Sequence, residues 1–153
     1  MPTVKKVQVV NYEPHQMYDL VNAIEDYPKF LPWCKHTKIH YRDDSEVKAT
    51  VDMAKGPLQQ SFTTLNRLTK NRRIDLTYVK GPFRRLEGAW LFEPIGEGRC
   101  RLQFEITYEF ANRLLSLAIE PVFFPISQSL IESFHLRAKE IYGNPAPQDA
   151  VSH

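Results

Sequence analysis

Histidine and cysteine side chains have the widest chemical repertoire of any groups in this chain. His36 and His40 are four residues apart in a segment whose pattern predicts a strand, and that spacing separates them by about 13 Å. Two ligands at that distance do not hold one metal ion, so we predict no metal site. Cys34 and Cys100 lie far apart in sequence without CxxC spacing, which favours buried, reduced thiols.

Motifs of known catalytic machinery are absent from the sequence. It contains no GxSxG, HExxH, P-loop or GxGxxG pattern. The strand and helix faces that we expect to turn inward are apolar and offer few groups for acid–base chemistry. We therefore predict a protein that is not an enzyme, with no catalytic residues and no required cofactor.

Length and composition fit one soluble domain. The chain has 153 residues, of which 42% are hydrophobic and 25% charged, and its net charge of +2 divides into +6 over residues 1–85 and −4 over residues 86–153. No uninterrupted apolar run reaches the roughly 18–20 residues of a membrane span. The first residues lack the apolar core of a secretory signal. We expect a cytoplasmic protein without a transmembrane segment.

The clearest structural signal is the junction near residue 112. Residues 99–110 alternate between apolar and polar side chains, which predicts a strand with one dry face. Asn112 is a suitable N-cap for the helical region that follows. Pro121 and Pro125 predict a short helix at 113–119, a break, and a main helix at 125–142 that ends at Gly143. The predicted dry stripe of this helix is Ile126, Leu130, Phe134, Ala138 and Ile141.

The rest of the chain predicts six more strands and two short helices. A strand at 4–10 precedes helices at 14–24 and 27–31, the second capped by Asp26. Strands follow at 33–42, 46–55, 59–69, 72–79 and 85–94, separated by turns rich in Gly, Pro, Asn and Asp. Short connections favour antiparallel hairpins, and Gly88 among large residues indicates a bend.

These elements predict an α+β fold. It has a curved seven-stranded antiparallel sheet wrapped around a long C-terminal helix, with two short helices between strands one and two. Residues 1–143 form one domain, and we expect residues 144–153 to be a flexible tail.

Three segments carry a family resemblance: YPKFLPWC at 27–34, GPFRRLEGAWLF at 81–92, and the stretch 104–143. In this order they resemble the coenzyme Q-binding START family, which has a helix-grip fold, and in particular its bacterial ribosome-association toxins. The resemblance covers residues 1–143. It implies a cavity for ubiquinone or another polyprenyl lipid, in relatives that support cellular respiration. It also implies binding to the large ribosomal subunit that blocks subunit association, with a small antitoxin protein as partner.

Some relatives with the helix-grip fold are enzymes. The alternatives to the main hypothesis are therefore an aromatic polyketide cyclase-like enzyme, which would need converging polar groups in its pocket, and a simple lipid carrier without a ribosomal role.

The candidate ligand-binding residues are large apolar side chains on faces predicted to turn inward. Either they fill a solid core, or the bent sheet encloses more volume than they occupy. Tyr78, Tyr108 and Ser133 are the candidate polar anchors in such a cavity. The full set of ligand-binding candidates is Phe62, Tyr78, Trp90, Phe92, Phe104, Tyr108, Phe123, Leu130 and Phe134.

Basic side chains gather at two connections between strands. Either they are solvated charges, or they contact the phosphates of ribosomal RNA in a salt-sensitive way. They are Lys70, Arg72 and Arg73 at one predicted hairpin, and Lys80, Arg84 and Arg85 at the next.

The first part of the helical region, residues 113–125, is apolar on nearly all sides. Either it is fully buried, or it forms a mobile lid that meets a membrane surface or a partner. Its two prolines favour independent motion because they remove backbone hydrogen-bond donors.

Overall fold

Short hairpins order the strands into a single antiparallel sheet. The computed structural model describes residues 2–144, and its sheet order is β1-β7-β6-β5-β4-β3-β2. Each strand from β2 to β6 pairs with the strand that follows it in sequence. Strand β1 pairs with the other edge of β7, where Val4 lies opposite Ile106. The strands are β1 (Thr3–Val10), β2 (Cys34–Arg42), β3 (Glu46–Lys55), β4 (Leu58–Thr69), β5 (Arg73–Lys80), β6 (Phe83–Pro94) and β7 (Cys100–Phe110).

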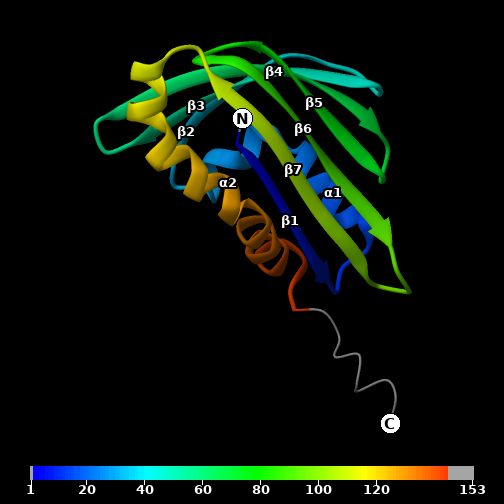
Figure 1. Cartoon of the computed structure of the whole chain (residues 1–153). Coiled ribbons are helices and arrows are strands. Elements are labelled where there is room, and N and C mark those ends of the chain that lie inside the picture. Colours follow the sequence, from blue (N-terminus) through cyan, green and yellow to red (C-terminus); the bar gives the residue numbers. More distant parts are fainter. Residues whose placement is uncertain (1, 145–153) are drawn as a thin grey trace.

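The sheet curves over one long helix, α2 (Arg113–Tyr142), as Figure 1 shows. Two short helices, α1 (Pro14–Asn22) and the 3-10 helix η1 (Ile24–Lys29), lie between β1 and β2 in sequence. The predicted fold class is therefore confirmed. Apart from Asn144, the predicted tail lies outside the described residues.

The second short helix begins earlier than predicted. The chain leaves α-helical geometry at Ala23, which has φ −84° and ψ 63°, and η1 then starts at Ile24. Asp26 donates its backbone N–H to the Ala23 carbonyl at 3.0 Å and lies inside the helix. The prediction that Asp26 caps this helix is therefore wrong, because η1 begins at Ile24 and its N-cap residue is Ala23.

Helix α2 is continuous, which corrects the predicted break between residues 119 and 125. Asn112 caps it as expected, since its Oδ1 accepts a hydrogen bond from the Leu115 N–H at 2.9 Å. Pro121 and Pro125 lie inside the helix, and both are exposed. They are four residues apart, so the carbonyl groups that they leave without donors lie on one outer face, open to water. The helix bends (Figure 1) instead of breaking.

Gly88 permits the sheet to bend where β6 lies between two partners. It pairs with Leu76 of β5 and with Ile106 of β7. A Cβ atom at this position would lie 2.5 Å from the Glu105 carbonyl oxygen. Only glycine allows so close a backbone approach, in agreement with the predicted bend.

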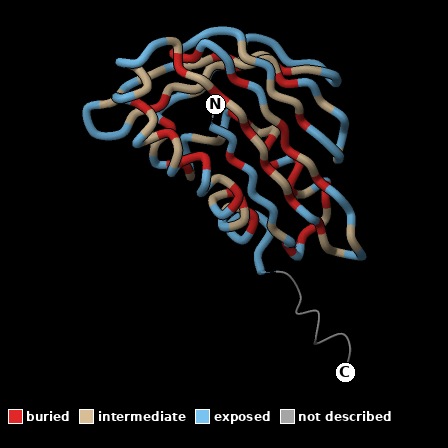
Figure 2. Tube along the Cα trace, viewed as in Figure 1, coloured by how far each residue is buried: buried red, intermediate tan, exposed pale blue. Residues whose placement is uncertain are grey.

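The inner face of the sheet and the inner stripe of α2 form the core. All six apolar side chains of the predicted dry face of β7 are buried. Figure 2 shows buried residues following the strands and the side of α2 that faces the sheet. Within the predicted stripe of α2, Ile126, Phe134 and Ala138 are buried and Leu130 is half-buried, but Ile141 is 50% exposed. The stripe therefore ends at Ala138.

The first turns of α2 are not fully buried, so that alternative for residues 113–125 is wrong. Leu114 is 79% exposed and Leu117 is 65% exposed, whereas Ile119 and Phe123 are buried. By length and composition alone α2 could cross a membrane, with a mean hydropathy of 1.5 in its most apolar window. The sequence pattern did not reveal this helix as a candidate membrane span, because polar residues interrupt its apolar run. The helix nevertheless packs its buried stripe on the sheet, as the core helix of a folded domain does.

Candidate ligand cavity and charged surfaces

An apolar cavity lies between the inner face of the sheet and α2. Its volume is about 100 Å³, well below the roughly 300–1,000 Å³ of typical small-molecule sites. Both alternatives for the core are thus partly met, because most of the interior is filled and a small hollow remains. Six of the predicted ligand-binding residues line it: Phe62, Trp90, Phe104, Phe123, Leu130 and Phe134.

The other three predicted ligand-binding residues lie outside the cavity wall. The Phe92 ring packs edge-on against Tyr18 at 5.6 Å. The Tyr78 hydroxyl accepts a hydrogen bond from the Phe83 N–H at 3.1 Å. Tyr108 is fully buried and packs edge-on against Phe123 at 4.8 Å. These side chains support the cavity from behind.

The polar groups of the cavity differ from the predicted anchors. Tyr78, Tyr108 and Ser133 do not line it, and the Ser133 hydroxyl donates to the Ser129 carbonyl within α2. The polar residues that do line the cavity include Thr64 and Asn66 on β4 and Ser127 on α2. The signal for the first two was in the sequence, because Phe62, Thr64, Asn66 and Leu68 alternate and share one face of a strand.

Several apolar residues of the wall were also missed. They come from η1, from the segment before β2, from β3, β5, β6 and β7, and from α2, which sequence spacing alone does not bring together. The missed apolar and aromatic lining residues are Ile24, Tyr27, Trp33, Val51, Met53, Leu76, Leu86, Ile106 and Ile126.

No Lys, Arg, Asp, Glu or His lines this cavity among the described residues. Outside the wall, Glu120 Oε1 accepts a hydrogen bond from the Tyr108 hydroxyl at 3.0 Å. Burial, together with Glu120, raises the pKa of Tyr108. Glu120 Oε2 is buried without a hydrogen-bond partner. The cavity itself therefore presents a neutral interior.

None of the cysteines or histidines of the described residues lines the cavity. Cys34 and Cys100 are free and buried, as predicted, and burial raises the pKa of each thiol to about 11. His36 Nδ1 lies 3.3 Å from Asp52 Oδ2, whereas His40 Nε2 is hydrogen-bonded to Thr50 at 2.7 Å. Within residues 2–144 no three potential metal ligands gather in one place.

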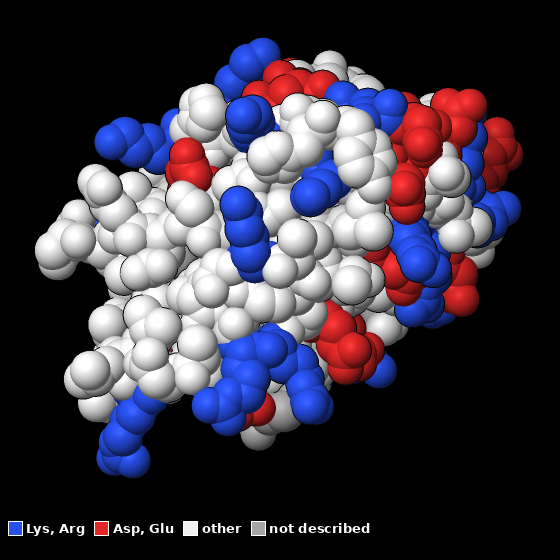
Figure 3. Space-filling view, turned by 90° about the horizontal axis from the view of Figure 1, so that it is seen from above, with Lys and Arg blue, Asp and Glu red and all other residues white. Residues whose placement is uncertain are grey.

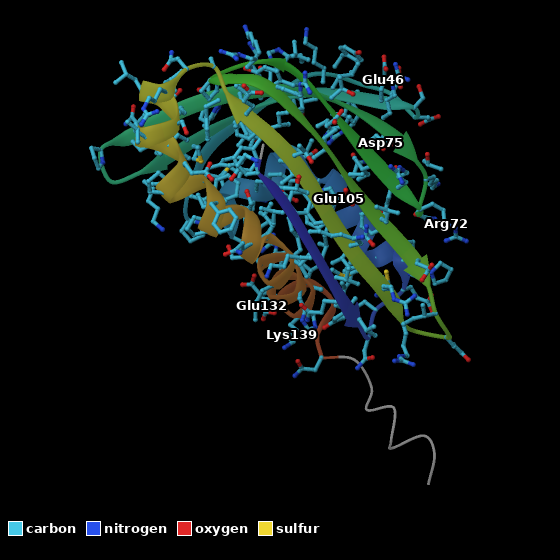
Figure 4. All side chains as sticks on the ribbon, viewed as in Figure 1. Glu46, Arg72, Asp75, Glu105, Glu132 and Lys139 are labelled. Carbon is cyan, nitrogen blue, oxygen red and sulfur yellow. The ribbon has the colours of Figure 1, made fainter. Side chains whose placement is uncertain are left out.

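The two predicted basic clusters lie at opposite ends of β5. Arg73 begins that strand and Lys80 ends it, which separates the clusters by about 23 Å. Figure 4 shows Arg72 at the β4–β5 end of the sheet. Arg73 pairs with Asp75 at 2.8 Å, and Arg84 pairs with Glu109 at 3.2 Å. The structure therefore provides two basic sites and not one continuous patch.

A groove of about 610 Å³ on the outer face of the sheet connects the two clusters. Arg73, Arg84 and Arg85 line it, but so do Asp75, Glu87 and Glu105. Figure 3 shows acidic side chains concentrated on one side of this face with basic ones among them, and further basic side chains spread among uncharged residues. Because carboxylates lie between the clusters, the groove is not a uniform surface for phosphates.

These features define a START-like, helix-grip protein with a small neutral interior cavity. The chain matches the model of the family described as Polyketide cyclase / dehydrase and lipid transport over residues 10–135, and it belongs to that family.

Two individual relatives show which members of the family this chain is similar to. The Ribosome association toxin RatA of Escherichia coli (strain K12) is 39% identical over 93% of this chain and 90% of its own length. The Coenzyme Q-binding protein COQ10 homolog B, mitochondrial, of Xenopus laevis is 26% identical over 89% of this chain and 57% of its own length. The predicted resemblance to the coenzyme Q-binding START family and its bacterial toxins is thus confirmed.

Solved structures agree on the fold. The Zhui aromatase/cyclase of Streptomyces sp. R1128 matches with a TM-score of 0.82 at 12% identity, covering 94% of this chain and 98% of that one. A START superfamily protein of Mycobacterium smegmatis matches with a TM-score of 0.76 at 19% identity, covering 91% and 98%. At these identities the likeness shows the fold alone.

Proposed function

We propose that this protein is a non-enzymatic, cytoplasmic binder of a neutral hydrophobic molecule of the polyprenyl quinone class. The observation that carries the proposal is an interior cavity walled by aromatic rings and free of charged side chains among the described residues. Its relative from Xenopus laevis, named as coenzyme Q-binding, supports the choice of ligand class. Ubiquinone and related prenylated quinones fit such a wall because the whole molecule is uncharged.

The cavity must expand to admit such a ligand. About 100 Å³ corresponds to roughly three water molecules at ~30 Å³ each, which leaves no room for a polyprenyl tail. Each buried methylene contributes about 0.8 kcal/mol, so one five-carbon isoprene unit contributes about 4 kcal/mol toward opening. Half-buried Phe62, Trp33 and Leu130 line the cavity and are among the side chains that can move aside.

The absence of Asp, Glu, His, Lys and Arg side chains from the described cavity wall supports a binding role over a cyclase-like one, and the hydroxyl of Tyr27, the one tyrosine there, donates to the Val21 carbonyl at 2.5 Å. A general acid or base must reach the reacting atoms within hydrogen-bond distance, and the hydroxyls of Thr64 and Ser127 are already engaged as donors to Asn66 and to the Phe123 carbonyl. The shared fold of the aromatase/cyclase supplies no residue correspondence at 12% identity.

Fluorescence titration tests the proposal. The two tryptophans of the chain, Trp33 and Trp90, both line the cavity, so a short-chain ubiquinone should quench them saturably at one equivalent. Ile126→Arg places a charge in the wall and should abolish the quenching. Its matched control, Ile141→Arg, lies on the same helix at a position 50% exposed and should bind like the wild type. Linear quenching without saturation in the wild type would contradict the proposal.

A second function, association with the large ribosomal subunit that blocks subunit joining, is favoured by the 39% identity to the Escherichia coli toxin. We propose that the two basic clusters contact ribosomal RNA independently, since about 23 Å separates them. A small antitoxin partner is part of the same proposal.

Sedimentation with dissociated ribosomes at two salt concentrations tests the ribosomal role. The double variants Arg72→Glu/Arg73→Glu and Arg84→Glu/Arg85→Glu should each weaken co-sedimentation and reduce its salt dependence, because fewer phosphates are neutralised. Lys139→Glu, an exposed position at the end of α2, is the control. Unchanged binding by both double variants would remove the clusters from the interface.

A further inference from the structure

The cavity contains a polar side chain that the apolar wall does not satisfy. Asn66 of β4 is only 7% exposed and lines the cavity. Its Oδ1 accepts a hydrogen bond from the Thr64 hydroxyl at 2.8 Å. With Oδ1 as the acceptor, the Nδ2 group is the end of the amide left to face the cavity.

An amide donor that faces the cavity must find its acceptor in whatever fills the cavity. Burying a hydrogen-bonding group without a partner costs about 1–3 kcal/mol, and such groups are rare in folded proteins. An apolar residue of the same size would avoid that cost if the cavity only needed to be filled. A ligand that displaces water from the cavity and offers an acceptor to this amide is therefore favoured over a purely hydrocarbon one.

The remaining polar atoms of the cavity limit the chemistry of that ligand. The Ser127 hydroxyl donates to the Phe123 carbonyl at 2.9 Å, so its proton is already used. No cationic side chain lines the described wall to neutralise a carboxylate or a phosphate. The unmet demand is for a neutral oxygen acceptor.

We propose that Asn66 is the head-group anchor of this cavity, and that its Nδ2 donates to a ring carbonyl of a neutral quinone. This inference rests on the proposed ligand-binding function and adds the position and polarity of the head group. Thr64 acts as a positioning residue because it holds the amide with its donor end free. The carbonyl lies beside Asn66, on the β4 side of the cavity.

Two ligands with the same tail test the assignment on the full chain. Decylubiquinone carries the carbonyl acceptors and decylbenzene lacks them, and isothermal titration calorimetry measures the binding of both. Asn66→Leu, which keeps the size and removes the donor, should weaken decylubiquinone binding by about three- to tenfold. It should leave decylbenzene binding unchanged or stronger. Asn11→Leu, the same substitution at an exposed site, should change neither.

The outcomes separate the two proposals. If the wild type binds decylubiquinone and Asn66→Leu binds it equally well, Asn66 is not the anchor although the cavity binds quinones. If the wild type binds neither compound, the proposed function fails and the anchor with it. Circular dichroism shows whether Asn66→Leu folds. Should it not fold, Thr64→Val releases the amide from its fixed orientation, and it must selectively weaken decylubiquinone binding if the proposal holds.

Discussion

Replacing Phe134 by alanine should destabilise the protein more than any other single truncation in α2. The ring is 1% exposed, lines the cavity, and lies within 5.5 Å of the rings of Tyr27, Phe30 and Trp90. Truncation of a buried phenylalanine costs about 3–5 kcal/mol. The new hole joins an existing hollow of about 100 Å³, so the neighbours have little means of collapsing into it. We expect a loss near the upper end of that range.

Urea unfolding followed by far-ultraviolet circular dichroism measures this loss. Leu136→Ala is the matched control, because Leu136 is in the same helix but 52% exposed, and it should change the free energy of unfolding by about 0.5 kcal/mol or less. An apolar hole of this kind binds benzene, so saturating benzene should restore part of the stability of Phe134→Ala only. A loss below about 1 kcal/mol for Phe134→Ala, or equal losses for both variants, would refute the description of the core.

Two further predictions concern the sheet and the pH dependence of stability. Gly88→Ala brings a Cβ atom 2.5 Å from the Glu105 carbonyl oxygen, so it should lower the free energy of unfolding by about 1–3 kcal/mol in the same urea assay; no loss would contradict the close approach of β6 and β7. Burial lowers the pKa of His135 below its ordinary value of 6.5, Lys139 lowers it further, and Glu132 opposes them. The unfolded chain therefore binds the proton first, and the contribution of His135 to stability is present above pH 6.5 and is lost as the pH falls below it. His135→Gln should flatten the decline in stability between pH 7 and pH 5, and an unchanged slope would count against this assignment.

Much of the fold could be predicted from local patterns. The alternation in residues 99–110 and the turn residues between strands sufficed for the seven-stranded sheet, because period two and hairpin connections determine strand direction and order. The prolines of α2 misled the prediction because sequence alone does not show that Pro121 and Pro125 lie on one exposed face. On that face a helix bends without losing buried hydrogen bonds.

The candidate site was harder to predict than the fold. Large aromatic residues such as Trp90 and Phe104 were predicted correctly because they stand on the strand faces whose alternation predicts that they turn inward. Tyr78 and Tyr108 were chosen as anchors for their hydroxyls, but both hydroxyls are satisfied within the protein. Asn66 was missed because an asparagine in a strand usually indicates a solvent-facing or turn position, and only its register with Phe62 places it inside.

The two predicted basic clusters do not merge into one patch, for a topological reason. Lys70 to Arg73 and Lys80 to Arg85 are neighbours in sequence, yet β5 runs between them in extended form and separates them by its whole length. Proximity along the chain is a poor guide to proximity in a sheet, where residues close in space come from adjacent strands.

The most direct test of the whole account is the location of the ligand in the complex. Isotope-filtered nuclear Overhauser spectroscopy of the protein saturated with a short-chain ubiquinone would identify the protons that touch it. We predict contacts from the quinone ring to Trp90, Phe104 and Ile126, which line the interior. Contacts confined to Leu114 and Leu117 on the outer side of α2, or to the groove around Glu105, would contradict an interior binding site.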